Sequence, residues 1–365
     1  MAKLGDYVKI RTGKLDANAS SESGRYPFFT CAIEPLKIDR YSYDCECVLV
    51  AGNGDLNVKY YSGKFDAYQR TYIIESMDKT FLDVQYLYFF MDKYLETLRS
   101  QSIGGVIKYI KLGNLTEADI FIPSIERQRE IVQILKKSRK LISLRKQQLA
   151  KLDELVKARF VEMFGDCKTN PKNWNTKALE KIANVGSSKR VFVEELQDGG
   201  IPFYRGTEIG ALAEKKAVKP ELFITEEHYK QLCEATGKPQ KGDLLMPSIC
   251  PDGRIWIVDT DEPFYFKDGR VLWAHLTSAN YNSVFLLYTL KDRIMTDYTS
   301  IASGTTFAEL KIFALKKCKV FDVPLELQNQ FAAYVERVDQ QKQTVQQSLE
   351  KLELMKKALM QEYFG

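Results

Sequence analysis

The chain contains an internal repeat. Residues 126–165 align without a gap with residues 326–365, exactly 200 positions later, and both copies end in Phe-Gly. The identical pairs are Glu126/Glu326, Gln128/Gln328, Gln147/Gln347, Leu149/Leu349, Lys151/Lys351, Leu152/Leu352, Lys157/Lys357, Ala158/Ala358, Glu162/Glu362, Phe164/Phe364 and Gly165/Gly365. Self-similarity at a fixed offset is typical of duplicated structural units, so the chain is predicted to hold two copies of one unit.

The repeat continues upstream at a smaller offset. Leu4 and Lys14 align with Leu179 and Lys189, 175 positions later, whereas Arg70 aligns with Arg270 at the full 200. The second copy therefore contains an insertion, which we place near residues 214–240. Within it, Thr225 is followed by two glutamates, which predicts a short helix that begins there and ends at Gly237.

Each copy has the pattern of a globular head followed by one long helix. Short apolar runs predict strands at residues 47–50, 71–74, 244–246 and 254–258, and helical spacing predicts helices at 82–98 and 284–294. Residues 51–55 and 300–306 are rich in small and polar residues and are expected to be loops. The predicted fold class is α+β, with two mixed α/β heads joined by a pair of long antiparallel coiled-coil helices. The predicted segments are a first head at 1–122, a first helix at 123–165, a second head at 166–322 and a second helix at 323–365.

Positions at alternating spacings of four and three are mostly apolar in both long segments, with the polar Ser138 and Arg145 among them in the first. The apolar residues are Ile131, Leu135, Ile142, Leu149, Leu152 and Val156 in the first, and Phe331, Val335, Val338, Val345, Leu349, Leu352 and Leu359 in the second. This spacing is a heptad seam and predicts two helices packed on each other. Each helix of about 40 residues would be about 60 Å long. The alternative is two ordinary surface helices that each cover their own head.

Composition narrows the class of protein without identifying it. The 365 residues are 45% hydrophobic and 28% charged, as in ordinary globular proteins. No apolar run approaches the roughly 18 residues of a membrane span, and the start of the chain does not resemble a secretory signal. Seven cysteines without a regular framework suit a reducing compartment. We therefore expect a cytoplasmic protein without a membrane partner.

The small positive charge of the chain is concentrated in one segment. Residues 126–165 hold 11 Lys or Arg and 5 Asp or Glu, a net of +6, whereas residues 326–365 hold 5 and 6, a net of −1. Because the chain totals +5, the remaining residues sum to zero. The basic side chains cluster at Lys136, Lys137, Arg139, Lys140, Arg145 and Lys146. They could form a solvated helix face or a stripe that faces the phosphates of a duplex.

Motifs for catalysis and metal binding are missing from the sequence. Cys45 and Cys47 have no second pair at zinc-finger spacing, and His228 and His275 are the only histidines. There is no Gly-x-Ser-x-Gly elbow, no phosphate-binding P-loop and no amino-methyltransferase Asn-Pro-Pro-Tyr motif. Gly52-Asn53-Gly54 lacks the third glycine of a dinucleotide fingerprint. We therefore expect a non-catalytic chain with no metal site and no cofactor of its own.

The order of head, proline, Glu-x-Gln helix, second head and second Glu-x-Gln helix resembles the specificity subunit of type I restriction–modification enzymes. Trp174 and the run Gly200-Ile201-Pro202-Phe203-Tyr204-Arg205 resemble the start of that family's target-recognition domain. Two later motifs of that domain resemble the runs Lys241-Gly242-Asp243-Leu244-Leu245 and Ser303-Gly304-Thr305-Thr306. The first copy departs from the pattern, since it lacks the leading tryptophan and its loop Ser102-Ile103-Gly104-Gly105 is an imperfect match.

The resemblance implies a function in DNA recognition. Each head would read one half of a split site in double-stranded DNA, and the helix pair would set the spacing between the halves. The site is expected to be asymmetric because the two heads differ in length and sequence. The implied protein partners are two methyltransferase (modification) subunits, which use S-adenosylmethionine and flip the target adenine, and restriction/translocase subunits.

Candidate DNA contacts are polar or basic side chains in loops, because base edges and phosphates are bound by such groups. In the first head we select Lys14, Arg25, Thr30, Asn53, Lys59, Gln69 and Arg70. In the second head we select Lys189, Arg190, Arg205, Thr207, Ser248, Arg254, Arg270, Thr305 and Thr306.

Two other functions fit the same duplicated pattern. One is a coiled-coil scaffold whose heads bind protein, although the basic first helix and the arginine-bearing and asparagine-bearing loops suit it less well. The other is the recognition subunit of a different DNA-modification or defence system.

Overall fold

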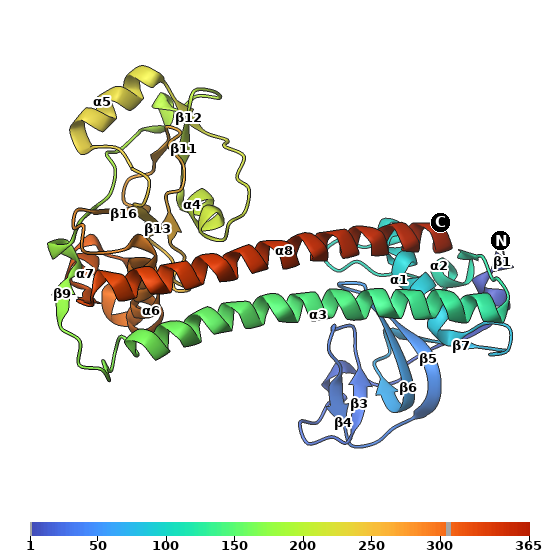
Figure 1. The fold of residues 1–365 in the computed structure, drawn as a ribbon. Helices are drawn as coiled ribbons and strands as arrows, with labels where there is room; N and C mark the ends of the chain where they lie inside the picture. The colour runs from blue at the N-terminus through green and yellow to red at the C-terminus, as the bar shows by residue number, and fades with distance from the viewer. Residues whose placement is uncertain (1, 304–307) are drawn as a thin grey trace. The chain divides into compact units, whose positions relative to one another are not determined.

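The structure is a computed structural model that describes residues 2–303 and 308–365 (Figure 1). The chain forms two compact units. Unit 1 is Met1–Gln148 together with Val345–Gly365, and unit 2 is Leu149–Thr344. Each unit therefore holds one head and one end of each long helix, and the mixed helix-and-strand class predicted from the sequence is confirmed.

The head of unit 1 is built on a six-stranded sheet. Its strands, in the order β2-β7-β5-β6-β3-β4, are β2 (Val8–Thr12), β7 (Thr71–Ser76), β5 (Tyr43–Ala51), β6 (Val58–Ala67), β3 (Tyr26–Phe29) and β4 (Leu36–Ile38). All neighbours are antiparallel except β3 and β6. Strand β5 is buried on both faces: Val48 and Val50 belong to the core that includes helix α1, whereas Cys47 and Leu49 belong to a second core. Its near-continuous apolar sequence follows from this, because alternate strand residues point to opposite faces.

Helix α1 (Val84–Gln101) covers one face of this sheet. It begins at Asp83, whose carboxylate accepts hydrogen bonds from the backbone N–H groups of Gln85 and Tyr86, a standard N-cap. The remaining elements of the head are β1 (Ala2–Lys3), paired with β8 (Asp119–Ile120), the short helix α2 (Leu112–Thr116), and two 3₁₀ turns, η1 (Leu4–Asp6) and η2 (Ala17–Ala19).

The head of unit 2 repeats this order. Its four-stranded sheet contains β10 (Ala183–Gly186), β16 (Val271–Leu276), β13 (Leu244–Pro247) and β14 (Trp256–Ile257), and its three-stranded sheet contains β12 (Phe223–Ile224), β11 (Ile201–Tyr204) and β15 (Tyr265–Phe266). Strand β11 runs parallel to β15, as β3 does to β6. The other elements are β9 (Thr176–Ala178), β19 (Lys319–Phe321), β17 (Ala302–Ser303), β18 (Glu309–Leu310), α6 (Ser283–Ile301), α7 (Ile312–Lys317), η3 (Leu179–Lys181) and η4 (Val193–Glu195).

Unit 2 also contains two helices without a counterpart in unit 1. Helix α5 (Glu226–Thr236) confirms the predicted insertion: the Thr225 hydroxyl accepts the His228 N–H at 3.1 Å, and Gly237 ends the helix with φ +80°. Helix α4 (Gly206–Ala213) was not predicted. Two glycines lower its intrinsic helix propensity, and it is stabilised instead by packing, with Ile209 fully buried in the core of the four-stranded sheet.

Most predicted elements are present at adjusted lengths. The four predicted strands lie within or overlap β5, β7, β13 and β14, and the two predicted helices correspond to α1 and α6. The loop expected at residues 300–306 is partly wrong, because α6 continues to Ile301 through a kink at Asp297 and β17 follows. Residues 304–306 lie outside the described part of the chain.

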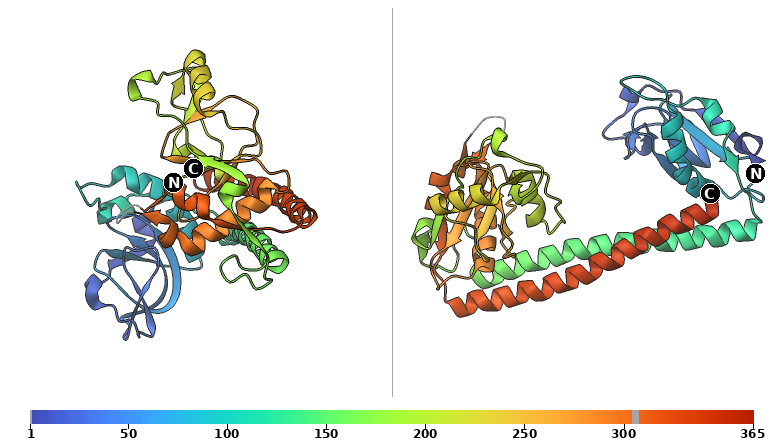
Figure 2. Two further views of the ribbon diagram at one scale, coloured as in Figure 1. Left: turned by 90° about the vertical axis from the view of Figure 1, so that its left-hand side faces the viewer. Right: turned by 90° about the horizontal axis from the view of Figure 1, so that it is seen from above.

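The two long helices are α3 (Ile125–Phe164) and α8 (Leu325–Phe364), each of 40 residues (Figures 1 and 2). In unit 1 the start of α3 packs on the end of α8, since Ile131, Leu135 and Met360 share one buried cluster. In unit 2 the end of α3 packs on the start of α8, with the rings of Phe160 and Phe331 5.5 Å apart. The helices are therefore antiparallel in both units, and the predicted heptad seam is confirmed.

One buried side chain is repeated at the base of each head. The Gln128 amide is fully enclosed, accepts the Asp83 N–H at 2.9 Å and donates to the carbonyls of Phe81 and Pro123. Gln328 makes the equivalent bonds to the Asn282 N–H and to the carbonyls of Asn280 and Val323. Each glutamine thus ties the first turn of a long helix to the N-cap of the helix that covers the sheet.

Loss of these buried amides should destabilise one unit at a time. Because Trp174, Trp256 and Trp273 all lie in unit 2, tryptophan fluorescence reports the unfolding of that unit. Gln328→Ala leaves one N–H and two carbonyls unpaired and should lower the free energy of unfolding of unit 2 by about 2 kcal/mol in urea titrations. Gln128→Ala should shift this fluorescence transition much less, and the exposed Gln330→Ala should not shift it. Equal shifts for Gln328→Ala and Gln330→Ala would contradict this role.

Candidate nucleic-acid interface

Three backbone segments meet at one end of the sheet in unit 1. They are the loop after β5, the turn before β7 and the loop that follows α1. The Gly52 N–H donates to the Arg70 carbonyl at 2.8 Å, and the Ile110 N–H donates to the Gly52 carbonyl at 2.9 Å. We call this arrangement loop crossing 1, comprising residues 52–57, 68–70 and 102–110. Its backbone hydrogen bonds hold irregular segments in place, so their side chains are presented from a defined frame.

Unit 2 contains the same crossing at structurally equivalent positions. The Ser248 N–H donates to the Arg270 carbonyl at 2.9 Å, and the Leu310 N–H donates to the Ser248 carbonyl at 2.7 Å. We call this loop crossing 2, comprising residues 248–254, 268–270 and the described parts of 302–310. Arg70 and Arg270, aligned by the sequence repeat, therefore occupy equivalent places.

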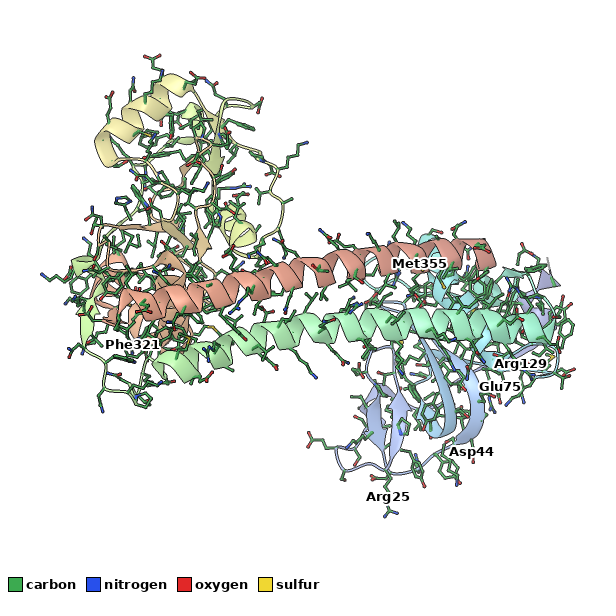
Figure 3. All side chains as sticks on the ribbon, viewed as in Figure 1. Arg25, Asp44, Glu75, Arg129, Phe321 and Met355 are labelled. Atoms are coloured by element: carbon green, nitrogen blue, oxygen red, sulfur yellow. The ribbon has the colours of Figure 1, made fainter. Side chains whose placement is uncertain are left out.

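Several predicted contact residues of the first head gather at loop crossing 1. The N–H of Gln69 donates to the Leu15 carbonyl at 2.9 Å, which places Lys14 beside the turn that carries Arg70. Asn53 lies in the loop after β5 and pairs with Tyr109 through an isolated bridge. Arg25 does not join this group. It is exposed at the start of β3, at the outer tip of the head, whereas the end of β3 approaches the crossing (Figure 3).

Three of the predicted contacts are not supported by the structure. Thr30 and Ser248 are 7% and 2% exposed, because each sits where a strand end is enclosed by neighbouring loops, so neither side chain is presented at the surface and their role as DNA contacts stays a prediction. The Thr30 hydroxyl accepts the Ala32 N–H instead. Lys59 is half-buried and donates to the Asn57 side chain, and burial lowers the pKa of its ammonium. Thr305 and Thr306 lie outside the described residues.

The arginines of unit 2 are held by carboxylates. Arg205 donates to Glu208 at 2.7 Å and to Glu221 at 3.0 Å. Burial raises the pKa of the Glu208 carboxyl, but hydrogen bonds from Arg205 outweigh this and hold that pKa at about 2. The other pairs are Arg254 with Asp252 at 2.8 Å, Arg190 with Asp268 at 3.5 Å, and Arg270 with Glu309. These guanidinium groups are oriented and partly neutralised in the free protein.

Helix α4 packs directly on loop crossing 2. A side chain added at Gly210 would come within 2.9 Å of the Arg254 guanidinium, and one at Gly206 within 3.2 Å of the Arg270 carbonyl. The two glycines therefore allow the close approach of helix α4 to loop crossing 2. Thr207 is exposed in the first turn of α4, and Lys189 is exposed on the preceding loop. Helix α4, which lies before the predicted insertion and has no counterpart in unit 1, thus modifies the candidate site, and the residue pattern alone did not indicate this.

Loop crossing 1 has a different electrostatic character. Arg70 in the crossing and Lys14 beside it are exposed, as is Arg25 at the outer tip of the same head, and within the described chain none of the three forms an ion pair. Gln69 is also exposed and donates to the Asp16 carboxylate at 2.7 Å. Unit 1 thus presents uncompensated cations, whereas unit 2 presents arginines already paired with acids.

The basic cluster on α3 is divided between two roles. Lys136, Lys137 and Lys140 are exposed. Arg139 instead points to α1, with its guanidinium 2.7 Å from the Asp92 carboxylate and 4.5 Å from the centre of the Phe89 ring. Lys146 pairs with Glu353 of α8 at 2.9 Å. Only part of the cluster can therefore act as a phosphate-facing stripe.

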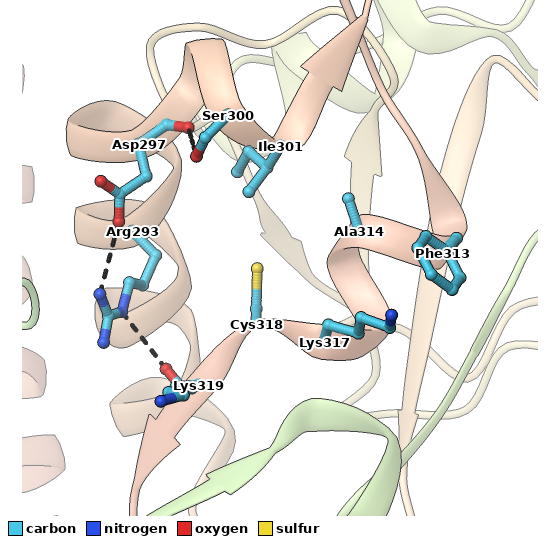
Figure 4. Close-up of a pocket in the computed structure, with 9 residues that line it drawn as sticks. All are labelled: Arg293, Asp297, Ser300, Ile301, Phe313, Ala314, Lys317, Cys318 and Lys319. Atoms are coloured by element: carbon cyan, nitrogen blue, oxygen red, sulfur yellow. Dashed lines mark hydrogen bonds and ion pairs between the residues drawn. The ribbon is translucent and has the colours of Figure 1, made fainter.

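The structure offers little support for chemistry in this chain. An open pocket of about 340 Å³ in unit 2 is lined by Arg293 and Asp297, which pair with each other at 3.4 Å (Figure 4). Burial raises the pKa of the Cys318 thiol in this pocket to about 11, so it is protonated at neutral pH. His275 lies 2.8 Å from Asp243, a carboxylate that Trp273 also binds. Across residues 2–303 and 308–365, no cluster of three potential metal ligands occurs and no helix is long and apolar enough to span a bilayer.

Comparison with known families agrees with this geometry. A profile of the type I restriction modification DNA specificity domain matches residues 1–154 and 171–354, which is most of the chain and includes both loop crossings. The chain belongs to this family. Its members provide specificity rather than catalysis, so the chain is a non-catalytic specificity subunit of the type I restriction–modification class, as predicted.

Individual relatives are also type I specificity subunits, and they match different shares of this chain. The Escherichia coli type I restriction enzyme EcoDI specificity subunit is 36% identical over 155 residues, 42% of this chain but only 34% of that subunit. A putative type I restriction enzyme specificity subunit of Haemophilus influenzae is 24% identical over 87% of this chain and 81% of its own length. The Methanocaldococcus jannaschii MjaVIII specificity subunit is 22% identical over 99% of this chain and 90% of its own length.

Solved structures share the fold. The type I restriction–modification S subunit from M. genitalium superposes with a TM-score of 0.63 at 17% identity, covering 100% of this chain and 95% of its own. A chain from a study of complex assembly and conformational transition of the type I R-M system gives 0.61 at 16% identity, covering 100% and 96%. At these identities the likeness concerns the fold.

The two equivalent arginines should contribute unequally to DNA binding. Replacing Arg70 with Gln removes an unpaired cation and should lower the slope of log affinity against log salt by about one, across specific and non-specific duplexes alike. Arg270→Gln should change this slope by less than half as much, because Glu309 already compensates that charge. The slopes would be measured by fluorescence anisotropy on the chain bound to its methyltransferase partner. Equal slope changes for the two variants would contradict the interpretation that Arg70 is an unpaired cation whereas Glu309 compensates Arg270.

Proposed function

We propose that this chain recognises an asymmetric bipartite site in double-stranded DNA, with one half-site read at each loop crossing. The observation that carries the proposal is the duplicated backbone frame, in which Gly52 and Ser248 make the same pair of hydrogen bonds in their respective units. The side chains on the two frames differ: uncompensated cations surround the first, and paired arginines with α4 surround the second. One backbone arrangement that carries two different sets of side chains suits two different half-sites, because side chains at the interface read the edges of the bases.

We further propose that α3 and α8 set the spacing between the half-sites. Each helix has 40 residues, equivalent to about 60 Å of helical rise. Both pack through an apolar seam, and Lys146–Glu353 in unit 1 and Asp153–Lys342 in unit 2 add antiparallel ion pairs. A continuous helix pair resists bending and is therefore suited to fix a distance.

We infer that the outer faces of these helices recruit the catalytic subunits. Ile134, Leu141 and Leu144 of α3 are 38%, 46% and 48% exposed, and their spacings of seven and three place them on one face of the helix. Apolar faces of this kind are typical of surfaces covered by a partner. Two methyltransferase subunits would bind here and supply S-adenosylmethionine and base flipping, and restriction/translocase subunits would join them in the cytoplasm. The chain itself would hold no cofactor.

Mapping of modified DNA tests the recognition proposal. DNA from cells that express this chain with its methyltransferase partner should carry methylated adenine in one split motif whose two halves differ in sequence. Long-read sequencing that detects methylated bases gives the motif directly, and cells that express the methyltransferase without this chain provide the control. A continuous motif, or a palindrome, would contradict reading by two different heads.

Lengthening the helix pair tests the spacing proposal. Seven residues inserted in α3 after Gln148 and seven in α8 after Thr344 preserve the heptad phase and add about 10 Å, or about three base pairs of duplex. The modified motif should keep both half-sites and gain about three base pairs of spacer by the same sequencing. Exchange of the seven native residues before Gln148 for another heptad of equal length is the control. An unchanged spacer in the lengthened chain would refute the measuring role of the helices.

A further inference from the structure

The loop that follows α1 forms a small closed hairpin. Ile103 and Tyr109 exchange two backbone hydrogen bonds, of 3.0 and 2.8 Å, and five residues lie between them. Gly104 has φ +116°, and a Cβ atom there would lie 2.5 Å from the Ile107 carbonyl, so the turn requires glycine. The conformation of the hairpin, including its tip, is thus fixed by its own hydrogen bonds and by Gly104.

The tip of this hairpin is apolar and fully presented to solvent. Val106 is 102% exposed and Ile107 is 62% exposed. The hairpin base is fixed to loop crossing 1, since the Gly54 N–H donates to the Lys108 carbonyl at 2.9 Å. Two adjacent exposed aliphatic side chains on a rigid base are typical of a surface that is buried on binding.

The charged side chains of the hairpin and of the segment after it are all basic, and the acidic Asp55 on the facing loop lies 3.8 Å from Arg99. Residues 100–116 contain Lys108 and Lys111 and no Asp or Glu. The unpaired Arg70 is linked to Ile110, at the end of the hairpin, by two backbone hydrogen bonds through Gly52. An apolar tip framed by cations matches a duplex, which presents stacked bases beneath two rows of phosphates. A partner protein would need an apolar socket with an acidic rim to match it.

Unit 2 carries the stem of the same hairpin. Ser303 of β17 pairs with Glu309 of β18, which is the register of Ile103 with Tyr109 shifted by 200 positions. The stem is further fixed by Tyr298, whose hydroxyl donates to the Ala308 carbonyl at 2.6 Å. The paired stem is therefore a feature that the described residues of both units share.

We propose that Val106 and Ile107 form an apolar wedge that inserts at one base step of the first half-site, while Lys108 and Arg70 hold the flanking phosphates. This inference rests on the proposed DNA recognition and deepens it. Apolar side chains inserted in this way partly unstack a base step, and the energy required depends on the sequence of that step. The wedge would then contribute to specificity without hydrogen bonds to base edges.

The test uses the chain in complex with its methyltransferase partner and duplexes carrying the mapped motif. A fluorescent adenine analogue is placed in turn at each position of the first half-site. For the unaltered complex, fluorescence should rise at one step on binding, because unstacking relieves quenching. The double variant Val106→Ser with Ile107→Ser should lose this rise and about tenfold in affinity, with an unchanged salt slope. Met77→Ser removes an apolar side chain that is 64% exposed at the far end of β7 and should bind like the unaltered chain.

Three results would overturn the wedge. They are an absence of any local fluorescence rise with the unaltered complex, full affinity of the double variant with the rise retained, and failure of the double variant to co-purify with the methyltransferase. The last result would assign the tip to protein docking. Failure of the proposed function would look different, since the unaltered complex would then bind mapped and scrambled duplexes equally. Thermal unfolding followed by circular dichroism verifies that the double variant is folded.

Discussion

The enclosed glutamines at the start of the long helices are the interactions on which the rest of the structure depends. Gln128 and Gln328 satisfy one N–H and two carbonyls each, all from the backbone of their own head. Because a buried polar group left unpaired is costly, each amide accepts only one geometry between helix and head. The loop crossings are presented in a defined way only if each head is fixed to its helix, and these amides provide that fixation in both units.

The two loop crossings share the same backbone hydrogen bonds and differ in the side chains around them. Gly52 and Ser248 differ in side chain yet make the same two backbone hydrogen bonds, and the approach in unit 1 requires glycine, since a Cβ atom at Gly52 would lie 2.5 Å from the Arg70 carbonyl. Around this frame the charges have diverged: Arg70 is unpaired within the described chain, whereas Arg270 is bound to Glu309. Helix α4, which has no counterpart in unit 1, adds a further surface in unit 2 alone. A common backbone with distinct side chains is how one architecture can serve two half-sites.

The repeat made the architecture predictable from sequence. Identical residues such as Gln128 and Gln328 indicate two copies of one structural unit, and the heptad seams indicate that the two long helices pack on each other. The site was less predictable. Thr30 and Ser248 have the residue types of DNA contacts, but residue type does not reveal that neighbouring loops enclose them. The pairing of Arg270 with Glu309 joins positions 39 residues apart, and no local pattern indicates it. Helix α4 has weak propensity and forms because of tertiary packing, so local sequence underestimates it.

Exchange of one head tests the central claim that each head reads its own half-site. Residues 166–322 would be replaced by the corresponding head of a family member with a different mapped motif, leaving both long helices intact. The methylated motif of the chimaera should retain the first half-site and the spacer length and acquire a new second half-site. A change in both half-sites, or no change in either, would contradict independent reading by two heads.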